Sequence, residues 1–166
     1  MSVSRWKMNR LGLVDFWCYE DDEFDFENGH MLLRGSNGSG KSVTMQSMIP
    51  LLLDGNRSSE RLDPFGTRSR KMDTYLIDEN SDRDERIGYL YLEFKRLASD
   101  VYKTIGMGIR ARKNKPLETW YFVIEDNRRV NIDFKLMENH FTLTKNNWKM
   151  YLVIKLFLVK ENICKK

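Results

Sequence analysis

Apolar and polar positions alternate in several stretches of the chain, which predicts strands there rather than helices. Residues 6–19 mix apolar and aromatic positions with polar neighbours, and residues 23–27 alternate two phenylalanines with carboxylates. Alternation with a period of two buries one side of a strand and leaves the other exposed. We therefore predict a strand in each stretch, with a turn at the acidic residues 20–23.

The second half of the chain repeats this pattern with short gaps. Residues 87–94, 102–112 and 119–126 each alternate in period two. Strands that follow one another through short connections pair antiparallel. The sequence thus predicts an antiparallel meander, followed by a turn at Asp126-Asn127 and a fourth short strand at 130–134.

The intervening region, residues 28–77, changes its period. A turn at Asn28-Gly29 and a strand at 30–34 are predicted first. Residues 41–55 then read as a helix whose apolar side carries Met45, Met48, Ile49 and Leu52. Pro50 removes one helical hydrogen bond, so a kink or break is predicted near Ile49. A polar loop at 56–71 and a second helical stretch at 68–77 complete the region.

Between the predicted strand and helix lies Gly35–Ser42, which matches the phosphate-loop pattern G-x-x-x-x-G-K-[ST]. Glycines let the backbone turn its N–H groups towards phosphate oxygens, and the next helix directs its N-terminus at the anion. Lys41 can reach the β- and γ-phosphates, and the Ser42 hydroxyl can bind Mg²⁺. The predicted cofactors are ATP and Mg²⁺, and the predicted phosphate-binding residues are Gly35, Ser36, Asn37, Gly38, Ser39, Gly40, Lys41, Ser42 and Val43.

No acidic residue of the sequence clearly fits the carboxylate that ATP hydrolysis requires. A phosphate-loop enzyme needs an acidic residue at the end of an apolar strand to hold Mg²⁺. Glu93 lies inside a predicted strand, whereas Glu125 and Asp126 follow four apolar residues but precede a turn. No S-G-G-Q-type signature and no guanine-reading [NT]-K-x-D motif is present. The sequence therefore favours ATP binding, assigns no catalytic residue and leaves the chain's own ATPase activity open.

The composition of the chain is typical of a globular protein rather than of a disulfide-rich or membrane-spanning one. The 166 residues suit one globular domain, and the net charge of +4 is concentrated in residues 145–166, which hold six lysines and one glutamate. Two cysteines make no disulfide framework, and the longest apolar run of ten residues is shorter than the roughly 20 that a membrane helix needs. These features predict a cytoplasmic protein without a membrane span.

The composition changes after about residue 134, beyond which neither glycine nor arginine occurs. We predict an ATP-binding unit over 1–134 and an atypical tail over 135–166. The tail is either a final strand with a basic end or a truncated or out-of-frame segment.

The stretch "GLVDFWCYEDDEFDFENGHMLLRGSNGSGKS" resembles the opening of the ATPase head in structural-maintenance-of-chromosomes (SMC) proteins and related ABC-type ATPases. The segments "LLLDGN", "ERLDPFGTRSRKM" and "GYLYLEFKR" are similar to those of the MukB-like condensin class, and most closely to the ATPase subunits of the Wadjet anti-plasmid type. The resemblance covers about residues 5–130. It implies an α/β fold, namely the N-terminal lobe of a phosphate-loop NTPase head with a mixed sheet, an antiparallel meander and a helix after the phosphate loop.

The resemblance also implies partners and further site residues. A C-terminal lobe would supply the signature and the catalytic carboxylates, a second head would sandwich ATP, and ring-closing subunits and DNA would complete the assembly. Trp17 or Tyr19 would approach the adenine, or else only pack in the core. The arginines that would reach phosphates or DNA, or else simply lie solvated in a loop, are Arg57, Arg61, Arg68 and Arg70.

On this reading the chain is a truncated ATP-binding lobe that serves plasmid defence or chromosome maintenance. Two alternatives stay open. One is a self-contained small phosphate-loop NTPase or kinase, although the alternating strands argue against its fully parallel sheet. The other is an unstable, non-functional gene remnant.

Overall fold

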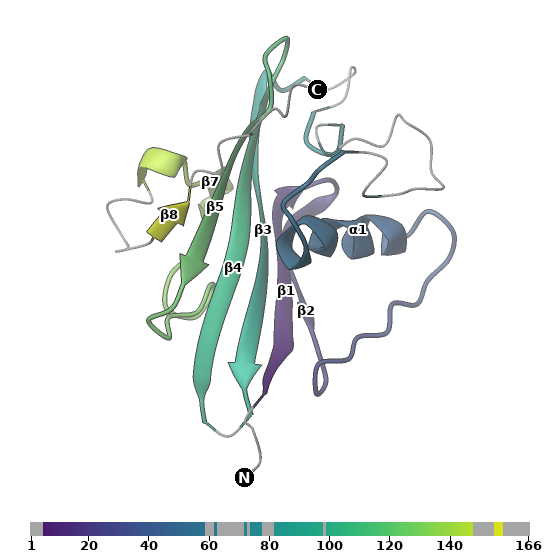
Figure 1. Ribbon diagram of the computed structural model, residues 1–166. Coiled ribbons are helices and arrows are strands. Elements are labelled where there is room, and N and C mark those ends of the chain that lie inside the picture. Colours follow the sequence, from purple (N-terminus) through teal and green to yellow (C-terminus); the bar gives the residue numbers. More distant parts are fainter. Residues whose placement is uncertain are drawn as a thin grey trace, which may run out of the picture.

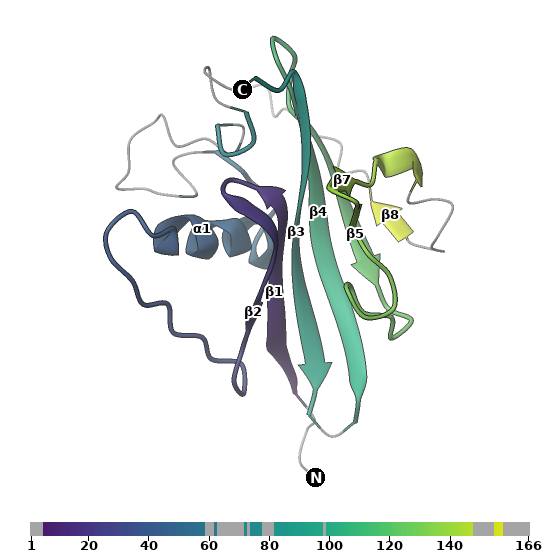
Figure 2. The same cartoon turned by 180° about the vertical axis from the view of Figure 1, so that it is seen from behind.

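The computed structural model describes residues 5–58, 62, 72, 74–77, 82–97, 99–147 and 155–157. Figure 1 shows a tall sheet with α1 against one face and the β6–β7 hairpin on the other side, and Figure 2 shows the same layers from behind. The elements are β1 (Trp6–Phe16), β2 (Tyr19–Asp25), α1 (Lys41–Leu52), β3 (Glu85–Arg96), β4 (Val101–Arg112), β5 (Glu118–Ile124), β6 (Met137–Glu138), β7 (Phe141–Thr142) and β8 (Lys155–Phe157).

The main sheet has the strand order β2-β1-β3-β4-β5-β8, and every neighbouring pair is antiparallel. The predicted meander of residues 87–126 is present as β3, β4 and β5. The predicted α/β class with a mixed sheet is wrong, since the described part of the chain is a β-rich antiparallel meander. Parallel pairing needs long crossover connections, whereas tight turns join β1 to β2 and β3 to β4 to β5.

The strand predicted at residues 30–34 is also wrong. A single antiparallel bridge joins Glu27 to His30 around the Asn28-Gly29 turn, which is present as predicted. Residues 31–35 then have no regular secondary structure, and Leu32 is 76% exposed. Figure 1 shows the segment between β2 and α1 running outside the sheet. Its apolar residues lack a described strand to pair with, so an apolar run alone did not make a strand here.

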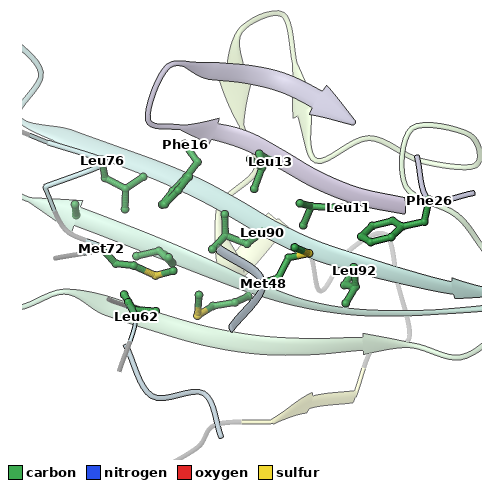
Figure 3. Close-up of a cluster of buried hydrophobic side chains, with 13 residues drawn as sticks. Leu11, Leu13, Phe16, Phe26, Met48, Leu62, Met72, Leu76, Leu90 and Leu92 are labelled. Atoms are coloured by element: carbon green, nitrogen blue, oxygen red, sulfur yellow. The ribbon is translucent and has the colours of Figure 1, made fainter. Parts of the chain in front are cut away.

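The face of the sheet under α1 holds the larger apolar cluster. Met48 of α1 belongs to the same buried cluster as the leucines of the central strands, and Figure 3 shows its side chain beside Leu90 and Leu92 over the sheet. The buried members of this cluster are Leu11, Leu13, Phe16, Phe26, Met48, Leu62, Met72, Leu76, Leu90, Leu92, Met107, Ile109 and Ala111. Burial of such a side chain contributes roughly 1.5–3 kcal/mol, so this cluster holds α1 on the sheet. Met72, Tyr75 and Leu76 were predicted on a helix, but the described residues there form turns.

The helix buries only part of the predicted apolar side: Met48 is buried and Ile49 packs against the core cluster. Thr44, Gln46 and Ser47 are buried together with Met48 and Pro50, whereas Met45 and Leu52 of the predicted apolar side are exposed. The buried polar groups are satisfied: the Ser47 hydroxyl, for example, donates to the Thr44 carbonyl. The helix also continues through Pro50 to Leu52, so the break predicted near Ile49 is wrong. Pro50 lies in the last turn of α1, and its missing N–H removes only the one bond that would reach the carbonyl four residues earlier.

The opposite face is built on glycines that face aromatic rings across neighbouring strands. Gly106 pairs with Phe122 and Gly108 with Trp120 between β4 and β5. An added Cβ would lie 2.0 Å from Phe122 Cζ and 2.2 Å from Trp120 Cε2. The rings therefore lie directly on the glycine backbones, which explains the alternation of glycines in β4. Tyr89 meets both rings edge to face.

A buried ionic network joins three strands on this same face. The Arg10 guanidinium contacts Glu93 Oε2 at 2.7 Å and Glu23 Oε2 at 2.7 Å, and it donates to the Val130 carbonyl at 3.0 Å. Arg129 approaches Glu93 Oε1 at 2.9 Å. The Glu93 side chain is fully buried. Because each charge has a partner of opposite sign, the network is compatible with burial, and it holds the segment after β5 against the sheet.

Glu93 should make stability depend on pH. Burial would raise the pKa of its carboxyl, but hydrogen bonds from Arg129, Arg10 and Asn9 outweigh this and lower the pKa from 4.5 to about 2. The carboxylate therefore stabilises the fold fully above about pH 4.5 and loses this contribution as the pH falls towards 2. We expect the free energy of unfolding to drop by about 3 kcal/mol across that window, measured by urea unfolding at stepped pH. Glu93→Gln should lack this component, and equal losses in both proteins would contradict the assignment.

Two smaller differences from the sequence predictions concern residues 20–23 and 130–134. The acidic residues belong to strand β2, and the chain turns at Trp17 and Cys18 instead. Residues 130–134 form a turn closed by one bridge rather than a strand.

In the tail, Leu136 is fully buried, and it and Leu143 pack in the apolar cluster that contains Trp120 and Phe122. Among the described residues no helix is long and apolar enough to cross a membrane.

Candidate functional site

The phosphate-loop residues form an exposed loop that leads into α1. Residues 34–39 are exposed, and the chain becomes buried at Gly40, where the helix begins. Gly38 and Gly40 have φ angles of +85° and +88°, a left-handed conformation that favours glycine. A Cβ on Gly38 would meet nothing within 4 Å. The loop is therefore shaped by its glycines and is open on the side of Gly38.

The Lys41 side chain forms hydrogen bonds with the phosphate-loop residues. Its ammonium donates to the carbonyl of Gly35 at 2.8 Å, to that of Ser36 at 2.7 Å and to Ser39 Oγ at 3.4 Å. All three contacts are exposed to solvent. The positive charge of Lys41 thus lies at the mouth of the loop on solvent-exposed hydrogen bonds, part of which an anion could replace.

The first turn of α1 follows immediately. Ser42 is exposed and Val43 is half-buried, and the first backbone bond of the turn runs from Thr44 N to the Gly40 carbonyl at 2.9 Å. N–H groups at the start of a helix lack partners inside it and attract anions. No acidic residue lies in this turn, so nothing there repels a phosphate.

A pocket of about 490 Å³ lies beside α1 and is lined by helix residues from Lys41 to Ile49. Lys41, Ser42 and Gln46 contribute its polar lining, and Leu33 and Met45 are among its apolar lining residues. The pocket is open rather than enclosed, in keeping with the exposed loop. Lys41 and Ser42 therefore belong both to the loop motif and to this pocket, whereas residues 35–40 are not among its lining residues.

The two predicted adenine residues are also brought to the loop. Trp17 lies in the turn between β1 and β2, Tyr19 is the first residue of β2, and their rings meet edge to face at 5.7 Å. A Cβ on Gly40 would lie 2.4 Å from Trp17 Cζ3 and 2.8 Å from the Tyr19 hydroxyl. Tyr19 Oη is 2.8 Å from Thr44 Oγ1. Both residues therefore contact the loop–helix junction itself, and an adenine contact stays a prediction.

The predicted arginines are not gathered at the loop in the same way. Arg57 follows the C-terminal end of α1 and is half-buried, and a helix of twelve residues is about 18 Å long. Arg61, Arg68 and Arg70 lie outside the described residues. A role for these arginines towards phosphate or DNA stays a prediction.

The acidic residues considered for hydrolysis are engaged elsewhere. Glu93 belongs to the buried network on the face away from α1, and Glu125 pairs with Lys103. Asp126 pairs with Arg128, and hydrogen bonds from that arginine lower the pKa of its carboxyl. In the described part of the chain, no cluster of three or more His, Cys, Asp or Glu side chains could hold a metal ion. A Mg²⁺ ion at the loop would therefore rely on Ser42, water and phosphate oxygens.

Sequence reasoning missed the polar contacts that connect α1 to its surroundings. Thr44 Oγ1 bonds Tyr19 and the Gly40 carbonyl, and the Tyr75 hydroxyl donates to Gln46 Oε1 at 3.3 Å. The sequence pattern assigns no role to Thr44 or Gln46 and places Tyr75 on the apolar side of a second helical stretch. The signal that could have found them is the pairing of small and amide side chains on α1 with tyrosines outside it.

No family model matches the chain, and no curated protein matches it. The resemblance to SMC-like heads therefore stays a prediction that depends on the motifs quoted above.

Proposed function

We propose that the chain binds ATP with Mg²⁺ through the loop Gly35–Ser42. The observation that carries the proposal is the Lys41 ammonium, held at the mouth of a glycine loop directly before the N-terminus of α1. Lys41 would exchange its carbonyl contacts for the β- and γ-phosphate oxygens, and the free N–H groups of the loop and first turn would bind further oxygens. Ser42 would hold Mg²⁺, which when bound neutralises phosphate charge.

In this proposal the chain alone binds ATP, and hydrolysis needs carboxylates from elsewhere. The engagement of Glu93, Glu125 and Asp126 in ion pairs supports that division. By the resemblance, the missing groups belong to a C-terminal lobe and a second head of an SMC-like ATPase. That assembly would act in the cytoplasm on DNA, in plasmid defence or chromosome maintenance, with ring-closing subunits. The loop supports ATP binding directly, whereas the assembly rests on the resemblance.

Replacing Lys41 with alanine should weaken Mg²⁺-ATP binding by about tenfold to a hundredfold, because the variant loses a hydrogen bond between two charged groups. Isothermal titration calorimetry on the purified chain measures this directly. Lys41 contacts only exposed loop atoms, so thermal unfolding followed by circular dichroism should be unchanged.

Lys113→Ala is the matched control, because this surface lysine lies just after β4 and pairs with Asp84, just before β3. It should bind ATP as the wild-type chain does. Equal affinities for wild type and Lys41→Ala would contradict the assignment of the loop, and a folded wild-type chain that binds no ATP would overturn the proposal for this chain alone.

A further inference from the structure

Hydrogen bonds hold Trp17 in place in the turn between β1 and β2. Asp15 and Trp17 both have positive φ, at 44° and 54°. The Trp17 N–H donates to the Tyr75 carbonyl at 2.8 Å, and the Trp17 carbonyl accepts from Arg86 Nη2 at 2.9 Å. Arg86 Nε donates in turn to Asp15 Oδ1 at 2.9 Å. Positive φ is uncommon in non-glycine residues. These bonds hold the Trp17 backbone in that conformation, and the edge-to-face contact with Tyr19 at 5.7 Å places its ring.

The fixed ring lies against the last glycine of the phosphate loop. A Cβ on Gly40 would lie 2.4 Å from Trp17 Cζ3 and 3.1 Å from Cη2. Gly40 has φ +88° and ψ −1° and is the residue from which α1 starts. Contact with the indole therefore restricts the backbone at the point where the loop becomes helix, immediately before Lys41.

Tyr19 adds a directed hydrogen bond to the same junction. Thr44 is buried, and its hydroxyl donates to the Gly40 carbonyl at 3.1 Å. A threonine hydroxyl has one proton, so in the 2.8 Å contact between the two hydroxyls Tyr19 is the donor. The Tyr19 ring also packs edge to face against Trp17 and Phe24. Tyr19 therefore contacts α1 through its hydroxyl and packs against Trp17 and Phe24 through its ring.

We propose that Trp17 and Tyr19 are positioning residues for the phosphate loop and that they serve the phosphate chain of the ligand rather than its base. They hold Gly40 and the first turn of α1 so that Lys41 and the N–H groups beside it converge on phosphate oxygens. The inference rests on the proposed ATP binding. It predicts that the same two residues matter for any ligand with a triphosphate, including one that has no base.

The test compares Mg²⁺-ATP with inorganic triphosphate by calorimetry in wild type, Tyr19→Phe and Trp17→Ala. Tyr19→Phe keeps the ring and removes only the hydroxyl, so it should weaken both ligands by the same factor of about three to tenfold. Trp17→Ala should likewise weaken both ligands equally. Loss of ATP affinity with unchanged triphosphate affinity, in either variant, would show a base contact and overturn the proposal.

Two variants separate positioning from general stability. Thr44→Val removes the partner hydroxyl, and its effect should not add to that of Tyr19→Phe, because the two hydroxyls act as one unit. Tyr89→Phe removes a hydroxyl bond to the Leu143 carbonyl on the opposite face and should leave both affinities unchanged. Additive effects of the first pair, or an equal loss in Tyr89→Phe, would contradict a positioning role.

Hydrogen exchange distinguishes failure of this inference from failure of ATP binding. If the wild-type chain binds neither ligand, the proposed function fails, yet the loop can still be examined. Tyr19→Phe should then speed amide exchange at residues 40–44 and leave β3 and β4 unchanged. Unchanged exchange at residues 40–44 would overturn the positioning role whatever the ligand result.

Discussion

Glu93→Gln should destabilise the protein by about 3–5 kcal/mol, the cost of breaking a buried ion pair on one side. Glu93 is fully buried and is the shared partner of Arg10 and Arg129. Glutamine keeps the size of the side chain but removes the negative charge, so two guanidinium groups face each other with only Glu23 to offset them. Arg10 is itself 5% exposed, and water cannot replace the lost carboxylate. Urea unfolding at neutral pH measures the difference.

Glu125→Gln provides the matched control. Glu125 pairs with Lys103 at 2.9 Å, but both side chains are about half exposed, and exposed pairs contribute roughly 0–1 kcal/mol. A loss below 1 kcal/mol in Glu93→Gln, or similar losses in both variants, would show that the buried network does not hold the sheet together.

Gly106→Ala should cost about 1–3 kcal/mol or more through overpacking. The new methyl group would lie 2.0 Å from Phe122 Cζ, well inside contact distance. Phe122 is 1% exposed and has Tyr89 against it, so the ring has little room to move away. Thermal and urea unfolding should both show the loss.

The double variant Gly106→Ala with Phe122→Leu tests the cause. Leucine lacks the ring atoms that the methyl group would meet, so the double variant should lose less stability than the sum of the two single variants. Strict additivity would mean that the glycine is needed for its backbone rather than for the space beneath the ring.

The local pattern predicted the strands of the meander well and their wider context poorly. Alternation in β3, β4 and β5 shows which residues face a core, and short connections make antiparallel pairing the simple outcome. Residues 30–34 have the same apolar character, yet no partner strand lies beside them among the described residues. A strand depends on what pairs with it, and a single sequence does not reveal that partner.

Charged residues misled the prediction for a related reason. Residues 20–23 look like a turn because they are acidic, but Glu23 meets Arg10 and Tyr91, and Asp21 meets Asn131. Tyr91 and Asn131 lie far away in the sequence, and Arg10 lies on the neighbouring strand. In the candidate site the glycine loop, Lys41 and the following helix were read locally from the motif, whereas the Tyr19–Thr44 bond needed the fold to bring the two residues together.

The pairing of β1 with β3 has a consequence for the order of folding. Leu13 pairs with Leu90, so the phosphate loop and α1 both lie inside the long connection that this pairing must close. Contacts distant in sequence form late because closing a long loop costs entropy, whereas β3, β4 and β5 can assemble through short turns. The β1–β2 turn supports the loop only after β1 has joined the sheet. Ligand-binding competence should therefore be among the last properties gained on folding and among the first lost on unfolding.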